Sequence, residues 1–233
     1  MQSSDYMARK NRLEAYFDRT AADKWSTLTS DAPVGRIRAT VRAGRDNMRD
    51  NLIAWLPSVM DNTRLLDAGC GTGAVTEIAA ARGAHVTAAD VSPTLIDIAR
   101  DRIPEEQLAR VEFHVGDMLD DALGDFDYVL AMDSMIHYGC DHLVNMLATY
   151  APRTRKAILF TFAPKTFALT IMHRVGRLIP NLEHRAPAIE PVSERALRQA
   201  IDAKPELANW HIDDVQPVSS GFYTSTAVRL VRA

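Results

Sequence analysis

The stretch Leu65-Leu66-Asp67-Ala68-Gly69-Cys70-Gly71-Thr72-Gly73 joins an apolar segment to three glycines at every second position. Glycine permits a sharp strand-to-helix turn and lets a ligand approach bare backbone. The free N–H groups at the start of the following helix add a positive electrostatic end. The stretch therefore predicts a strand, a glycine turn and a helix that together bind a nucleotide-type cofactor.

Two classes of cofactor remain open from this turn alone. Gly69-x-Gly71-x-x-Ala74, with Asp90 about 20 residues further on, satisfies the dinucleotide fingerprint of NAD enzymes. Asp67 argues against that class, because an acid directly ahead of the first glycine would lie beside pyrophosphate, whereas it suits a cationic ligand. The whole string resembles the first motif of class I S-adenosylmethionine (SAM) methyltransferases, in which the turn passes close to the cofactor and the acid anchors the site.

Strand-like and helix-like segments alternate after the turn, a pattern that implies a parallel sheet with right-handed crossovers. Strands are expected at 64–68, 85–89, 111–115, 126–132 and 156–162, with a closing pair at 210–218 and 221–231. Helices are expected at 74–82, 94–102, 141–150 and 193–203. The expected fold class is α/β, a Rossmann-like class I methyltransferase with a mostly parallel seven-stranded sheet and helices on both faces.

Acidic residues close three successive expected strands, at Asp90, Asp117 and Asp133. The carboxyl ends of parallel strands line the ligand crevice of an open α/β sheet. Asp90 is placed to accept hydrogen bonds from a ribose diol, and it is expected to be free for the ligand because Ser92 already supplies the next helix cap. Met118 follows Asp117 as in the methyltransferase motif whose acid and next residue meet the adenine ring.

Two helices are expected ahead of the turn. Tyr16 and Phe17 fall on the apolar stripe of a helix over 9–28, which either packs on the core or caps the active site with the Tyr16 hydroxyl facing a ligand. The second helix, 36–56, is rich in arginine, and most of these side chains are expected on a solvated face. Arg42 is the exception, because Gly44 thins the helix where a carboxylate could reach its guanidinium.

The loop after the fourth strand reads Asp133-Ser134-Met135-Ile136-His137-Tyr138. A His-Tyr pair beside the crevice suits hydrogen bonding to an oxygen nucleophile, although a structural role for His137 stays open. The cationic, amphipathic segment 165–179 predicts either a helix on the sheet edge or a lid over an apolar, anionic substrate at a membrane surface.

The expected domains are an N-terminal helical cap over 1–57 and a cofactor-binding core over 58–233, with a cap or lid insertion at about 164–192. The expected catalytic residues are His137 and Tyr16. The expected cofactor-binding residues are Arg42, Asp67, Gly69, Gly71, Gly73, Asp90, Val91, Asp117, Met118 and Asp133.

Composition excludes several other classes. The 233 residues are 47% hydrophobic and 24% charged, which suits one globular domain with a full core. The net charge of −3 disfavours a general nucleic-acid binder. The 2 cysteines are too few for a zinc site or a disulfide framework and favour a reducing, cytoplasmic setting. Neither an export signal nor a membrane-spanning segment is expected.

Several segments together resemble one particular family. Tyr16-Phe17, residues 40–44, the glycine turn, the 133–138 loop and Gly221-Phe222-Tyr223 are similar to the magnesium-protoporphyrin IX O-methyltransferases of chlorophyll and bacteriochlorophyll biosynthesis. The resemblance implies transfer of the SAM methyl group to one propionate carboxylate of Mg-protoporphyrin IX, giving the monomethyl ester and S-adenosylhomocysteine (SAH). It also implies the large subunit of magnesium chelatase as a partner, peripheral contact with the photosynthetic membrane, and no protein-bound metal.

A propionate resembles a glutamate side chain, whose pKa is about 4.3, so it is already an ionised nucleophile at pH 7. His137 and Tyr16 are therefore expected to orient the carboxylate as hydrogen-bond donors rather than to act as bases. Three alternatives remain: a SAM-dependent methyltransferase of another acceptor such as a quinone precursor, an NAD-dependent oxidoreductase, and a non-catalytic porphyrin carrier.

Overall fold

A seven-stranded sheet forms the centre of the molecule, in the order β3-β2-β1-β4-β5-β7-β6. The computed structural model describes residues 4–18, 35–165 and 188–233, so most of the lid expected at about 164–192 lies outside the described residues. The strands are β1 (Arg64–Ala68), β2 (His85–Asp90), β3 (Val111–Val115), β4 (Phe126–Ala131), β5 (Thr154–Phe162), β6 (Trp210–Ser220) and β7 (Tyr223–Arg232). β7 runs antiparallel to both of its neighbours, β5 and β6, and the other neighbouring pairs of these strands are parallel. The expected fold class is confirmed.

Residues of the central strands alternate between two buried layers. In β5, Leu159 joins the core layer that contains Met48 of the helix ahead of the sheet, whereas Ile158 and Phe160 join the opposite layer. Both faces of β5 are apolar because helices cover both sides, as expected for strands at the centre of an α/β sheet.

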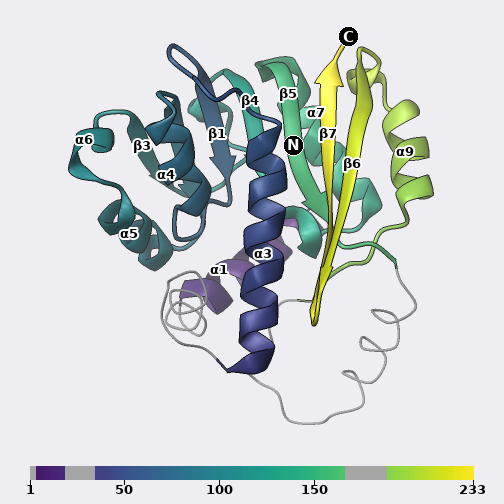
Figure 1. Ribbon diagram of the computed structural model, residues 1–233. Coiled ribbons are helices and arrows are strands. Elements are labelled where there is room, and N and C mark those ends of the chain that lie inside the picture. Colours follow the sequence, from purple (N-terminus) through teal and green to yellow (C-terminus); the bar gives the residue numbers. More distant parts are fainter. Residues whose placement is uncertain (1–3, 19–34, 166–187) are drawn as a thin grey trace.

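Helices cover both faces of the sheet (Figure 1). One face carries α3 (Arg36–Ala54), α4 (Ala74–Ala81) and α5 (Pro93–Arg102), and the other carries α7 (Cys140–Tyr150) and α9 (Glu194–Asp202). The remaining helical elements are α1 (Ser4–Tyr16), α6 (Glu105–Leu108) and the short 3-10 turns η2 (Asp121–Leu123), η3 (Met135–His137), η4 (Ala151–Arg153) and η5 (Pro205–Leu207). In Figure 1, α1 and the first half of α3 lie beyond the carboxyl ends of the parallel strands.

The second half of α3 belongs to the core. Met48 and Leu52 are fully buried in the same layer as β1, β4 and β5, and the helix packs against the β6–β7 hairpin. The sequence assigned this helix to an N-terminal cap over 1–57, whereas the second half of the helix shares the apolar core of the sheet.

The first helix differs from the expected range of 9–28. α1 spans Ser4–Tyr16 and is followed by a turn of π-helix at 17–18, while residues 19–34 lie outside the described part of the chain. The helix starts earlier because Tyr6, which the periodicity did not include, is buried against the core. Within the described residues, no helix combines the length and the apolar character needed to cross a membrane.

Candidate functional site

One cavity opens at the carboxyl ends of the parallel strands and encloses about 1130 Å³ including its mouth. Of the predicted site residues, those that line it are Arg42, Asp67, Gly69, Gly71, Asp90, Val91, Asp117, Met118, Asp133 and His137. Gly73 and Tyr16 are not among the lining residues. The structure thus brings nearly all of the predicted site into one place.

The three glycines of the turn share a backbone conformation that favours glycine, and two of them also permit a close contact. All adopt positive φ angles: 79° at Gly69, 54° at Gly71 and 78° at Gly73. A Cβ on Gly69 would lie 2.4 Å from the Cβ of Ser134, and a Cβ on Gly73 would lie 3.0 Å from that of Ala99. Gly69 therefore lets the 133–138 loop approach the turn, whereas Gly73 lets α4 pack against α5 rather than facing the cavity.

Asp90 holds the glycine turn in place. Its Oδ2 accepts the Gly71 N–H at 2.9 Å and its Oδ1 accepts the Ser92 N–H at 3.0 Å. Ser92 caps α5 as expected, by accepting the Leu95 N–H, but the expectation that this leaves Asp90 entirely free is wrong. Each carboxylate oxygen can accept a second hydrogen bond, so Asp90, which is 8% exposed, retains capacity for a ligand hydroxyl.

Asp67 is a buried acid beneath the turn. It is 2% exposed, and its Oδ2 accepts a hydrogen bond from the Thr76 hydroxyl at 2.6 Å. Burial raises the pKa of Asp67 to about 7; the Thr76 hydroxyl opposes the shift and the nearby Asp90 carboxylate adds to it. Because a nearby positive charge favours the ionised form, a cationic ligand at the turn would be held by this carboxylate.

Asp117 joins the cofactor side of the cavity to α1. Its Oδ1 accepts two hydrogen bonds, from the Tyr6 hydroxyl at 2.7 Å and from the Leu119 N–H at 2.9 Å. Its Oδ2 lies 3.7 Å from Lys10 Nζ, an ion pair rather than a hydrogen bond. Met118, the next residue, lines the cavity beside it.

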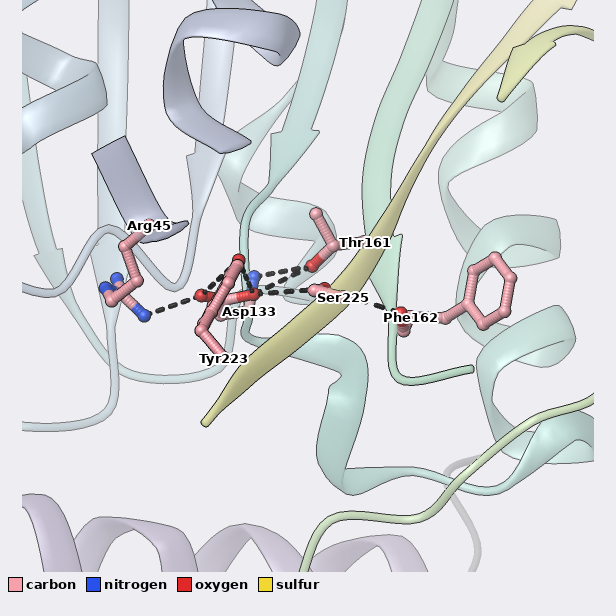
Figure 2. A network of polar contacts seen from close by, with 6 residues as sticks. All are labelled: Arg45, Asp133, Thr161, Phe162, Tyr223 and Ser225. Atoms are coloured by element: carbon pink, nitrogen blue, oxygen red, sulfur yellow. Dashed lines mark hydrogen bonds and ion pairs between the residues drawn. The ribbon is translucent and has the colours of Figure 1, made fainter. Parts of the chain in front are cut away.

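Asp133 lies at the centre of a polar network that ties four elements together (Figure 2). Its carboxylate accepts Arg45 Nη1 of α3 at 2.6 Å and the Tyr223 hydroxyl of β7 at 3.1 and 3.2 Å. Thr161 of β5 donates to the same carboxylate and accepts the Asp133 N–H at 2.8 Å. With φ of 56°, Asp133 turns the chain from β4 into the 134–138 loop. These contacts show a carboxylate that positions the loop, in addition to the cofactor contact that the sequence predicts for it.

His137 is 8% exposed and borders the cavity. Its Nδ1 lies 3.3 Å from the Ala188 carbonyl oxygen, which can only accept, so Nδ1 carries the proton of this bond. Burial lowers the pKa of His137, against the opposing effects of the Ala188 carbonyl and Asp133. In the neutral ring Nε2 is then an acceptor. The expected role as a donor to a carboxylate therefore requires the protonated ring.

Tyr16 and Arg42 each have a neighbour that the structure places in the site and that was not predicted as a catalytic or cofactor-binding residue. Phe17 rather than Tyr16 lines the cavity, and its ring meets the His137 ring edge-on at 6.2 Å. Arg42 lines the cavity, but Arg45 makes the ion pair with Asp133. The arginine-rich pattern indicated that α3 contributes to the site, but it could not show which arginine does so. That depends on which side chains face the cavity when the helix packs.

The donor set fits a SAM-like cofactor. Bare glycine backbone, the buried Asp67 and three strand-end acids meet in a single cavity, and their chemistry matches a ligand with a cationic centre, a ribose diol and an amino-bearing ring. Among the described residues, no group of three or more His, Cys, Asp or Glu side chains is arranged to hold a metal ion.

Comparisons with known proteins define the class. A family model described as "Methyltransferase domain" matches residues 65–156. The crystal structure of magnesium protoporphyrin IX methyltransferase from Synechocystis PCC 6803 with bound SAH superposes with a TM-score of 0.80, at 26% identity, over 96% of this chain and 100% of that one. The fold and the site are those of a class I SAM-dependent methyltransferase.

The relatives narrow the class to one family. A model described as "Magnesium-protoporphyrin IX methyltransferase C-terminus" matches residues 131–232. Magnesium-protoporphyrin O-methyltransferase of Rhodobacter capsulatus is 46% identical over 95% of this chain and 96% of its own length. The chloroplastic enzyme of Arabidopsis thaliana is 29% identical over 95% of this chain and 71% of its own. The chain belongs to the magnesium-protoporphyrin O-methyltransferase family.

Proposed function

We propose that the protein transfers the methyl group of SAM to one propionate carboxylate of Mg-protoporphyrin IX, giving the monomethyl ester in (bacterio)chlorophyll biosynthesis. SAM supplies the methyl group on a sulfonium. The observation that carries the proposal is the shared cavity, in which the His137 loop directly abuts the cofactor turn through the Gly69–Ser134 contact. A cofactor at the turn and an acceptor at the loop would therefore lie side by side.

His137 is the residue that we propose to orient the acceptor. Its ring is held by Ala188 on one nitrogen and by the Phe17 edge contact. A bound carboxylate raises the pKa of a neighbouring imidazole, because the opposite charge favours the protonated form. The protonated ring then donates from Nε2 to the carboxylate and holds it in line, a positioning effect of the kind that lowers barriers for two-reactant steps. No base is required, since the acceptor is already an anion.

Four basic side chains of α1 and α3 border the cavity: Lys10, Arg42, Arg45 and Arg49. Lys10, Arg45 and Arg49 are paired with Asp117, Asp133 and Asp46, and we propose that these basic side chains also attract the anionic acceptor. We propose that α1, with Phe17 at its end, provides the apolar side of the slot for the macrocycle and acts as the cap, while α3 stays with the core. Tyr16 remains a proposed contact with the acceptor.

The same proposal includes the large subunit of magnesium chelatase as the donor of the poorly soluble porphyrin, and peripheral contact with the photosynthetic membrane. The family resemblance supports both.

An acceptor comparison tests the function. Purified protein is given SAM with either Mg-protoporphyrin IX or a quinone precursor that carries a phenol, and SAH release is measured. We expect SAH only with the porphyrin, because its propionate is already an anion at neutral pH, whereas a phenol with a pKa of about 10 must first lose a proton. Turnover of the phenol alone would support the quinone alternative, and porphyrin binding without SAH would support a carrier.

A further inference from the structure

Tyr6 lies at the start of the chain, yet its hydroxyl reaches the acid on the cofactor side of the cavity. The side chain is 5% exposed, and its ring stacks on Tyr138 at 5.5 Å with an interplanar angle of 24°. This stacking fixes the ring, so the hydroxyl points at Asp117 from a rigid platform. Burial raises the pKa of Tyr6, which keeps the hydroxyl protonated and able to donate.

The two hydrogen bonds to Asp117 fall on a single oxygen. Oδ1 accepts from Tyr6 at 2.7 Å and from the Leu119 N–H at 2.9 Å, which uses both of its lone pairs. The carboxylate is thereby fixed in rotation with Oδ2 turned to the other side. Oδ2 has Lys10 only at ion-pair distance, 3.7 Å, and Asp117 borders the cavity. An oxygen held in this way is prepared to accept a hydrogen bond from a ligand.

We propose that Tyr6 is a positioning residue for recognition of the cofactor base. It fixes the Asp117 carboxylate so that Oδ2 accepts the exocyclic amino group of adenine and rejects a base that presents a carbonyl oxygen at that position. The first helix is thus part of the cofactor site, in addition to any role as a cap. This inference rests on the proposed use of SAM.

The test compares by calorimetry SAH with S-inosylhomocysteine, in which a carbonyl oxygen replaces this amino group and the adjacent ring nitrogen N1 carries a hydrogen. Wild type should prefer SAH. Tyr6→Phe keeps the ring stack and removes the hydroxyl, and it should reduce the ratio of the two affinities by roughly three- to tenfold, the range for loss of one hydrogen bond. Asp117→Asn should reduce it further, and adding Tyr6→Phe to Asp117→Asn should change the ratio little. Tyr128→Phe is the matched control, because Tyr128 lies on β4 away from the cavity, and it should leave the ratio unchanged.

An equal loss of affinity for both ligands in Tyr6→Phe would mean that Tyr6 only supports the fold, and the inference would be wrong. An unchanged ratio would overturn it as well. Failure of wild type to bind SAH at all is a different outcome, because it would contradict the proposed function itself.

Discussion

At the scale of single residues, the structure separates acids that look equivalent in the sequence. Asp90, Asp117 and Asp133 each close a parallel strand, but Asp90 holds the glycine turn, Asp117 joins α1, and Asp133 ties α3 to β7. The strand-end positions were predictable because the carboxyl ends of parallel strands meet at one edge. The partners were not, since Tyr6, Arg45 and Tyr223 come from parts of the chain whose packing no local pattern specifies.

The raised pKa of Asp67 leads to a prediction about cofactor binding. Burial places that pKa at about 7, so the carboxylate gains its charge as the pH rises through neutrality. SAM carries one positive charge more than SAH, and its affinity relative to that of SAH should therefore rise by about threefold to tenfold between about pH 6 and pH 8. Calorimetry with both ligands measures the ratio.

Asp67→Asn is the control, because it removes the titrating group while keeping the volume, and its ratio should stay flat over the same range. A slope that persists in Asp67→Asn would place the titration elsewhere.

His137 gives a second prediction with the opposite sign. The ring must be protonated to donate to the acceptor carboxylate, and its pKa is lowered by burial in the free protein. The KM for Mg-protoporphyrin IX should therefore increase as the pH rises between about pH 6 and pH 8, while SAH affinity is affected little. His137→Ala should lower turnover and leave SAH binding nearly intact.

His137→Gln tests whether protonation of the imidazole causes this pH dependence, because a glutamine amide donates a hydrogen bond but does not titrate. We expect this variant to keep measurable turnover with a KM that no longer depends on pH. If KM in His137→Gln follows the wild-type slope, another group controls acceptor binding.

At the scale of elements, one glycine explains how α3 meets the sheet. Because Gly44 has no side chain, the sequence predicted that a ligand could approach Arg42 at this point of the helix. The group that approaches is Tyr223 of β7, because a Cβ on Gly44 would lie 2.6 Å from Tyr223 Cδ1. The close contact was predictable from the glycine, whereas the identity of its partner was not.

Gly44→Ala should destabilise the protein although alanine is the better helix former. The helix preference would stabilise by about 0.5–1 kcal/mol. The clash displaces Tyr223 and its hydrogen bond to Asp133, and overpacking of this kind costs about 1–3 kcal/mol, so we expect a net loss of about 1–2 kcal/mol in the free energy of unfolding. Urea unfolding measures it.

Gly139→Ala is the control, because a Cβ on Gly139 would meet no atom within 4 Å, and a change below about 1 kcal/mol is expected. Stabilisation of the protein by Gly44→Ala would show that the packing of α3 on β7 is looser than described.

At the scale of the whole molecule, the sheet and its ligand crevice could be predicted from the sequence. The arrangement of the N-terminal region could be predicted only in part. Strands and helices of the core have strong local signals, such as the apolar runs of β1 and β5 and the Ser-Pro start of α5. The division into cap and core depends on long-range burial instead. Met48 and Leu52 decide that α3 belongs to the core, and helical spacing alone does not show what they pack against.

The central claim is that the chain joins a SAM methyl group to one propionate of Mg-protoporphyrin IX. The most direct measurement incubates the purified protein with SAM carrying a deuterated methyl group and with Mg-protoporphyrin IX, then identifies the porphyrin product by mass spectrometry. We predict a porphyrin that carries one labelled methyl group as an ester, together with an equal amount of SAH, and less of both when His137→Ala replaces wild type at the same concentration. The account would be contradicted if the protein binds SAH but the porphyrin carries no labelled methyl group.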